Sequence, residues 1–215
     1  MLKKAIQTLF IGAALFGAVG VQAAVEGKDY KKMPVQQSVE DASRLEVIEF
    51  FWYGCSHCYS IEPHMAAWAQ KLPKDVNFRR VHVVWPGRSD LEGHARLFLA
   101  LQTMGIEHKY GLAVFNAVQR ERIELRREKT LFDWVQKQGI DLNKFKSAYS
   151  SFSVNMQLNR LTQLTKNYQI EGVPAIVVNG KWLTGPSVHG REDANVTRII
   201  DEMLNAERQA RAKKK

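Results

Sequence analysis

Residues 50–59 have the sequence Phe50-Phe51-Trp52-Tyr53-Gly54-Cys55-Ser56-His57-Cys58-Tyr59, which contains the only two cysteines of the 215-residue chain. Gly54 allows a sharp turn after an apolar strand, so we expect Cys55 in the first turn of a following helix. Unpaired backbone N–H groups and the helix dipole favour negative charge there, and a thiolate is such a charge. Cys58 places a second sulfur one helical turn away, able to close a ring with the first. The pair is therefore predicted to store and transfer two electrons.

The segment before the cysteines, Leu45–Trp52, is nearly continuous apolar sequence rich in bulky and β-branched residues, as is typical of a central strand. Alternation places Glu49 on one face with Val47 and Phe51, and apolar side chains also fill the other face. We therefore expect a buried carboxylate. Because burial raises a carboxyl pKa and is unfavourable without a partner, two interpretations stay open: a proton carrier near Cys58, or a polar core residue satisfied by a partner.

The rest of the chain divides into strand-like and helical stretches. Val25–Gln37 is an extended segment with Tyr30 and Val35 as expected strand contacts. The other elements that we predict are a helix over 55–71, a strand over 76–85, helices over 109–126, 131–138 (capped by Thr130) and 142–150 (capped by Asp141), a long helix carrying Val154 to Tyr168, a hairpin over 172–183 turning at Asn179-Gly180, and a closing helix over 195–211.

The order of these elements predicts the fold class. Strand, helix, strand, helical block, hairpin and helix are typical of an α/β protein whose central mixed sheet is interrupted by a helical insertion. We expect one part of the sheet domain over residues 24–88, the helical insertion over 89–165, and the second part over 166–215. With 45% hydrophobic residues, the chain can bury an ordinary core.

The first residues predict export. Met1–Lys4 is basic, Ala5–Val21 is apolar, and Val21-Gln22-Ala23 supplies the small residues expected before a cleavage site. We expect a signal peptide over residues 1–23, cut after Ala23, and hence a periplasmic protein. A retained membrane anchor is the alternative, although the apolar run is short and diluted by glycines. Export also argues against a cytoplasmic reductase.

The charge of the chain is basic. Removing Lys3 and Lys4 with the leader leaves 29 basic residues against 22 acidic ones, which gives the mature chain a net charge of +7. Part of the excess lies in residues 208–215 and part in 120–129, where the two signs alternate, so both stretches are interpreted as solvated surfaces. Nucleic-acid binding would require aromatic residues interleaved with an uninterrupted basic patch, so we expect no nucleic-acid partner.

A metal site and a haem site are the rival interpretations of the cysteine motif. Cys55, His57, Cys58 and His64 are candidate metal ligands, but structural zinc usually takes four ligands from two paired motifs and the chain has no second cysteine pair. Covalent haem attachment requires a histidine directly after the second cysteine, where Tyr59 stands. We therefore expect no metal and no cofactor.

The chain resembles the thioredoxin superfamily and, within it, the DsbA family of periplasmic thiol:disulfide interchange proteins. The resemblance covers nearly the whole mature chain. It rests on Glu49-Phe50-Phe51, on Cys55–Tyr59 and on Gly172-Val173-Pro174-Ala175, with the helical block between the two halves of a thioredoxin fold. Family members commonly carry proline where this chain has Ser56, which affects the expected reduction potential but not the chemistry.

The resemblance implies a role for each matched residue. Cys55 would be the exposed nucleophile and Cys58 the buried resolving thiol of a redox-active disulfide. Pro174 would be a cis-proline facing that disulfide. Without the resemblance, the local sequence around Pro174 would favour a trans proline at a sheet edge. Val173 would offer its backbone to an extended substrate segment. Glu49 matches the acid beneath the disulfide.

His57 lies between the two thiols. Its imidazole, or the imidazolium at lower pH, could stabilise the Cys55 thiolate; the alternative is an exposed helix residue without a role.

Two classes of function remain open. The first is an enzyme that gives its disulfide to reduced or unfolded secreted proteins and is reoxidised by a quinone-linked membrane partner of the DsbB type. We expect this enzyme to be a monomer. A reducing or isomerising protein is a variant of this class, but no N-terminal dimerisation domain precedes the fold. The second is a chaperone or peptide-binding module with a structural disulfide. A disulfide that closes so short a loop constrains little chain entropy, which disfavours the second class.

Overall fold

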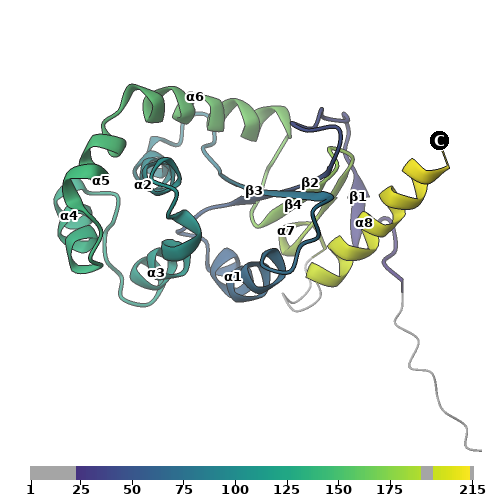
Figure 1. Cartoon of the computed structure of the whole chain (residues 1–215), viewed down its shortest axis with the longest axis horizontal. Coiled ribbons are helices and arrows are strands. Elements are labelled where there is room, and N and C mark those ends of the chain that lie inside the picture. Colours follow the sequence, from purple (N-terminus) through teal and green to yellow (C-terminus); the bar gives the residue numbers. More distant parts are fainter. Residues whose placement is uncertain (1–22, 190–195, 214–215) are drawn as a thin grey trace, which may run out of the picture.

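The computed structural model describes residues 23–189 and 196–213, whose centre is a five-stranded mixed sheet (Figure 1). The strand order is β1-β5-β4-β2-β3, and β2 pairs with β3 in parallel while the other neighbours are antiparallel. The strands are β1 (Tyr30–Lys32), β2 (Leu45–Phe51), β3 (Val76–His82), β4 (Ala175–Val178) and β5 (Trp182–Thr184). The predicted mixed α/β sheet is confirmed.

Strand β2 lies inside the sheet and every one of its residues is buried. Leu45 and Val47 belong to an apolar cluster that also contains residues of the helices α1 (Ser56–Ala69) and α8 (Val196–Ala212). Ile48 and Phe50 belong to a second cluster on the other side. In Figure 1, α1 and α8 lie on one side of the sheet and α6 lies on the other. The continuous apolar run is thus explained by two covered faces.

The segment between β3 and β4 is helical. It contains a short 3₁₀ turn η1 (Ser89–Leu91), α2 (Glu92–Thr103), α3 (Glu107–Gln119), α4 (Glu128–Lys137), α5 (Leu142–Tyr149) and α6 (Phe152–Asn167); a one-turn helix α7 (Pro186–His189) follows β5. Figure 1 shows α2 to α5 gathered beside the sheet, while α6 extends from them across one face of it.

Two helix starts illustrate local capping. The Asp141 side chain accepts a 3.0 Å hydrogen bond from the Lys144 N–H, so the predicted cap of α5 is confirmed. The predicted cap at Thr130 is wrong, because α4 begins two residues earlier at Glu128 and Arg127 stands at its cap position. An acidic residue in that first turn, Glu128, interacts favourably with the helix dipole.

Three other sequence predictions need correction. The single helix predicted over 109–126 is wrong, because α3 ends at Gln119 and Arg122 adopts a left-handed φ of 57°. The chain after α3 then passes close to Gly93, where an added methyl group would lie 2.8 Å from the Arg126 backbone. The strand predicted over 76–85 ends at His82. Val35 makes no strand and is 57% exposed.

The hairpin predicted at Asn179-Gly180 is confirmed. Both residues have positive φ, 52° and 66°, as a tight turn between antiparallel strands requires. A side chain at Gly180 would lie 2.1 Å from the Gln37 carbonyl oxygen, so this position also needs glycine for a close backbone approach.

The signal peptide predicted over 1–23 falls almost wholly outside the described residues. Within the described ranges, no helix has the length and apolar character needed to cross a membrane.

Candidate active site

Cys55 is the N-cap residue of α1, at the point where the chain leaves β2 and turns through Gly54. Its Sγ accepts a 3.4 Å hydrogen bond from the backbone N–H of Cys58, and its own N–H donates to the Trp52 carbonyl at 2.9 Å. Both cysteines are free thiols, so the structure describes the dithiol form of the pair. The predicted placement of Cys55 at a helix N-terminus is confirmed.

The two thiols have pKa values displaced in opposite directions. The pKa of Cys55 is lowered from 9.0 to about 6, first by the hydrogen bond from the Cys58 thiol, and then by the backbone N–H groups of Cys58 and His57 and by the charge of His57; partial burial opposes these effects. The pKa of Cys58 is raised well above 9.0, mainly because the thiol is buried. At neutral pH the pair therefore holds one thiolate, on Cys55, and one thiol, on Cys58.

His57 is exposed and follows Cys55 by two residues. Its backbone N–H and its charge both lower the Cys55 pKa, but less than the Cys58 thiol does. The imidazole is therefore a minor contributor in this geometry, while the backbone of the first helical turn provides stabilisation that does not depend on the side chain.

The loop before β4 meets Cys55 from the opposite side of the site. The Val173-Pro174 peptide bond is cis, as the resemblance implied. Cys55 Sγ lies 3.4 Å from the Val173 carbonyl oxygen, a hydrogen-bond distance for the protonated thiol, which places this loop in direct contact with the Cys55 sulfur. The Pro174 carbonyl accepts a 2.6 Å hydrogen bond from the Ser187 hydroxyl of α7, which fixes the loop on its far side.

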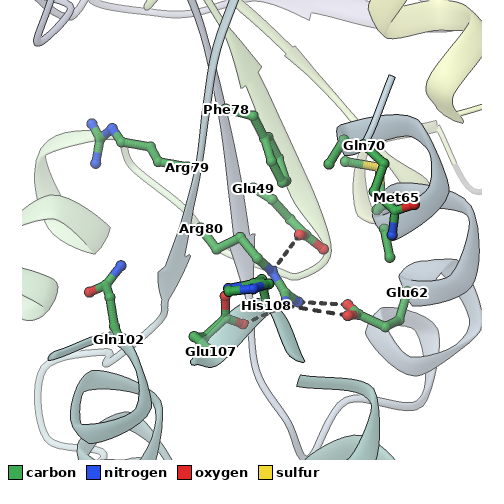
Figure 2. A pocket seen from close by; sticks show the side chains of 12 residues that line it. Glu49, Glu62, Met65, Gln70, Phe78, Arg79, Arg80, Gln102, Glu107 and His108 are labelled. Carbon is green, nitrogen blue, oxygen red and sulfur yellow. Dashed lines mark hydrogen bonds and ion pairs between the residues drawn. The ribbon is translucent and has the colours of Figure 1, made fainter. Parts of the chain in front are cut away.

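Glu49 is fully buried in β2 and has a partner that sequence reasoning did not identify. The Nε of Arg80, its neighbour in the parallel ladder, donates a 2.9 Å hydrogen bond to Glu49 Oε2. The same guanidinium binds Glu62 of α1 at 2.7 Å and Glu107 of α3 at 2.8 Å (Figure 2). It also lies 4.1 Å from the centre of the Phe51 ring. One arginine thus joins two strands and two helices.

This cluster holds three carboxylates around one cation. Burial raises the pKa of Glu49, against the attraction of Arg80, and it raises the pKa of Glu62 to about 7 for the same reason. Arg80 stays charged, because the three carboxylates outweigh its own burial and raise its pKa. Glu49 Oε1 is buried and has no hydrogen-bond partner among the described residues. The cluster borders a pocket of about 400 Å³ whose wall also includes Met65, Phe78 and His108.

Glu49 also acts on the Cys58 thiol, because its charge contributes to the raised pKa of Cys58. The predicted burial of the Glu49 carboxylate is therefore confirmed. Its partner is Arg80, and its charge also reaches the Cys58 thiol. A signal for Arg80 was present in the sequence: two consecutive arginines, Arg79 and Arg80, interrupt an otherwise strand-like segment. An arginine in a strand beside a buried glutamate is typical of a buried ion pair.

The rival metal interpretation finds no geometric counterpart in the described part of the chain. No group of three or more His, Cys, Asp or Glu side chains there could hold a metal ion.

Comparison with known proteins places these features in a family. Residues 77–196 match the model of the DSBA-like thioredoxin domain. The chain is 40% identical to the thiol:disulfide interchange protein DsbA of Burkholderia cepacia over 190 residues, which cover 86% of this chain and 89% of that protein. It is 37% identical to the protein of the same name from Azotobacter vinelandii, covering 98% and 100%. The chain belongs to the DsbA family.

Solved structures of the family confirm the thioredoxin fold with its helical insertion. The crystal structure of Pseudomonas aeruginosa DsbA is similar to this chain with a TM-score of 0.81 and 34% identity, over 88% of this chain and 97% of that one. The oxidoreductase NmDsbA1 from Neisseria meningitidis matches with a TM-score of 0.78 and 26% identity, over 87% and 96%. The chain is a thiol:disulfide oxidoreductase, and the predicted fold, family and enzyme class are confirmed.

Proposed function

We propose that the chain oxidises pairs of cysteines in newly secreted proteins by donating a Cys55–Cys58 disulfide. The observation that supports this direction of the reaction is the position of Cys55 at the N-cap of α1, where the Cys58 N–H donates to Sγ at 3.4 Å and the pKa of Cys55 is lowered to about 6. The reduced enzyme is stabilised by a thiolate that the disulfide form lacks, so the disulfide is readily given away.

The exchange proceeds in two displacement steps. A substrate thiolate attacks Cys55 Sγ of the enzyme disulfide, the Cys55–Cys58 bond breaks, and Cys58 leaves with the electron pair and takes up a proton. A second substrate thiolate then attacks the substrate sulfur of the mixed disulfide, and Cys55 leaves as a thiolate. The substrate loses two electrons, which the enzyme holds as one thiolate and one thiol. Cys55 suits both roles because it is partly exposed and its thiolate is a good leaving group.

The residues around the pair receive complementary roles in this proposal. Glu49 exchanges the proton of Cys58, which its position in β2 and its effect on the Cys58 pKa support. Val173 offers its backbone to an extended substrate segment next to Cys55, supported by the 3.4 Å contact between its carbonyl and the thiol. Pro174, which follows Val173, shapes the same loop. His57 adds positive charge near the thiolate.

The cellular setting follows from the same proposal. The redox-active disulfide is the enzyme's working group, and no further cofactor enters the two steps. The chain acts as a monomer in the periplasm after cleavage behind Ala23, and a DsbB-type quinone reductase of the membrane restores the disulfide. The names of the relatives, thiol:disulfide interchange proteins, support substrates that carry thiols or disulfides.

The decisive experiment mixes the oxidised chain with a reduced peptide that carries two cysteines, in the absence of oxygen, and follows both by mass spectrometry. We expect the peptide to lose two hydrogens as the enzyme gains two, with no reaction of a matched peptide that carries serine at both positions. A peptide left reduced, together with rapid reduction of insulin by the dithiol form, would identify a reducing protein instead. If the chain binds both the cysteine peptide and the serine peptide and no thiol exchange occurs, the chain is a peptide-binding module.

A further inference from the structure

The side chain of Trp52 is part of the turn that carries Cys55. A methyl group at Gly54 would lie 2.2 Å from Cζ2 of the indole, so the ring occupies the space where any side chain of residue 54 would stand. The Trp52 carbonyl also accepts the N–H of Cys55 at 2.9 Å. Because the same residue binds the turn through its backbone and covers it with its ring, a displaced indole would displace the turn.

The position of this indole is fixed from the helical insertion. Trp52 Nε1 donates a 3.2 Å hydrogen bond to Nδ1 of His94, a buried residue in the first turn of α2. Nδ1 can accept only when its proton is absent, so we assign the neutral ring with hydrogen on Nε2. Burial, assisted by the charge of Arg126 and opposed by that of Glu124, lowers the pKa of His94 to about 4. The acceptor is therefore present at neutral pH.

Two more hydrogen bonds from the helical insertion reach the same segment. Gln119, at the end of α3, donates from Nε2 to the Tyr53 carbonyl at 2.7 Å. One turn earlier, Asn116 accepts a 2.7 Å hydrogen bond from the Tyr59 hydroxyl. Tyr53 lies just before Gly54 and Tyr59 lies just after Cys58. The segment that carries the cysteines is thus held on both sides by hydrogen bonds from α3 that go to Tyr53 and Tyr59 and not to the sulfur atoms.

We propose that His94, through Trp52, and Gln119, through Tyr53, are positioning residues that hold the Cys55 sulfur against the backbone N–H groups at the start of α1. The Cys58 N–H reaches this sulfur at 3.4 Å, and a hydrogen bond to a thiolate weakens steeply when its geometry is lost. Loosening the turn removes stabilisation from the thiolate but not from the neutral thiol. The inference rests on the proposed function, since it concerns the same thiolate.

The test replaces His94 in the full mature chain. His94→Leu removes the acceptor at similar volume, whereas the Oδ1 of His94→Asn can take the place of Nδ1. Thr165→Val is the matched control, since Thr165 is also a buried polar residue, but its hydroxyl accepts from the Val84 N–H and donates to the Leu161 carbonyl and makes no hydrogen bond to residues 52–59. Two readouts are measured well below the melting temperature of each variant: the Trp52 indole N–H signal in the nitrogen-15 NMR spectrum, and the Cys55 pKa from thiolate absorbance.

We expect His94→Leu to shift the indole signal and to raise the proton affinity of Cys55 by about 3- to 10-fold, while His94→Asn keeps both close to wild type. At a pH well above the Cys55 pKa of both proteins, the equilibrium constant with glutathione should change by the same factor, and tenfold corresponds to about 30 mV. A moved indole signal with an unchanged Cys55 pKa would overturn the inference. An equal rise in Thr165→Val would also overturn the inference, because the loss of any buried polar contact would then raise the Cys55 pKa.

If His94→Leu does not fold, Gln119→Met tests the same inference at a half-buried position, and an unchanged Cys55 pKa in that variant overturns it as well. The result is separable from the proposed function, because it is read from the thiolate and not from turnover. A chain that fails to oxidise peptides can still show the shift, and an active chain can lack it.

Discussion

Arg80 and Glu49 face each other across the parallel pair β2–β3, joined by a 2.9 Å hydrogen bond between Nε and Oε2. The same guanidinium reaches α1 through Glu62 and α3 through Glu107. The helix that carries Cys55 is therefore anchored to the sheet by a charge network as well as by apolar packing.

Removing Arg80 should destabilise the fold strongly. Arg80→Leu leaves three carboxylates without their cation, and the loss of one partner of a buried ion pair typically costs about 3–5 kcal/mol. The loss should be larger at pH 8 than at pH 5, because the carboxyls can take up protons at the lower pH. Denaturant unfolding at the two pH values measures both effects. Arg160→Met, which breaks an exposed pair with Glu40, should cost less than about 1 kcal/mol; equal costs for the two variants would refute the anchoring role.

Glu49→Gln should lower the pKa of Cys58. The carboxylate is one of the charges that raise that pKa, and the amide keeps the shape without the charge. The pKa should remain above the ordinary thiol value, because burial is the larger cause. Carbon-13 NMR titration of the Cys58 Cβ measures it. Glu107→Gln is the control, since Glu107 binds the same guanidinium from α3. A Cys58 pKa shift of similar size in that variant would show that Arg80 transmits the effect.

The location of Cys55 could be predicted because it depends on local signals. An apolar strand, a glycine and a helical pattern place residue 55 at a helix N-terminus, and the structure confirms it. The Asn179-Gly180 hairpin and the Asp141 cap were likewise predictable from a few consecutive residues.

The features that sequence reasoning missed depend on contacts between distant elements. Arg80 becomes the partner of Glu49 only once β2 and β3 pair in their observed register. The path of the chain after α3 brings the Arg126 backbone against Gly93 of α2, and the hydrogen bond from Trp52 to His94 joins residues 42 positions apart. Periodicity along the chain contains none of this information.

The two cysteines should behave differently when replaced. Cys58→Ala leaves the Cys55 thiolate without its resolving thiol, so mixed disulfides with substrate should accumulate, whereas Cys55→Ala should abolish exchange because the remaining thiol is buried and its pKa is raised. Non-reducing gels of each variant, after incubation with a peptide activated as a disulfide, measure the trapped species. Equal trapping in both variants would contradict the assignment of Cys55 as nucleophile.

His57→Ser should raise the Cys55 pKa modestly and make the chain a weaker oxidant. The imidazole charge is the smallest of the stabilising causes, and the backbone N–H of residue 57 survives the substitution, so we expect a rise of less than about one unit. Thiolate absorbance gives the pKa, and equilibration with glutathione gives the redox effect. His64→Ser, an exposed histidine two turns further along α1, should change neither. An unchanged Cys55 pKa in His57→Ser would contradict a role for the imidazole and would mean that the helix backbone and Cys58 alone lower the Cys55 pKa.

The reduced form should be more stable than the oxidised form at neutral and mildly alkaline pH, the reverse of what a structural disulfide gives. The Cys55 pKa lies near 9.0 in the unfolded chain and is lowered to about 6 in the folded one. For an acid whose pKa is lowered by folding, the gain in stability is complete above the unfolded value and disappears as pH falls through the folded value. The gain is therefore full above pH 9, declines between pH 9 and pH 6, and is absent below.

Paired denaturant titrations of the reduced and oxidised chain at pH 8 and pH 4.5 test this window. The disulfide form has no titrating thiol, so the stability difference between the two forms should be large at pH 8 and should shrink at pH 4.5. His82 and His94, whose pKa values are lowered by burial, destabilise the fold in acid, but they are present in both forms and their effect cancels in the difference. An oxidised form that is the more stable one at pH 8 would mean that the Cys55–Cys58 bond serves to hold the helix end, and the chain would then be a structural or peptide-binding member of its family.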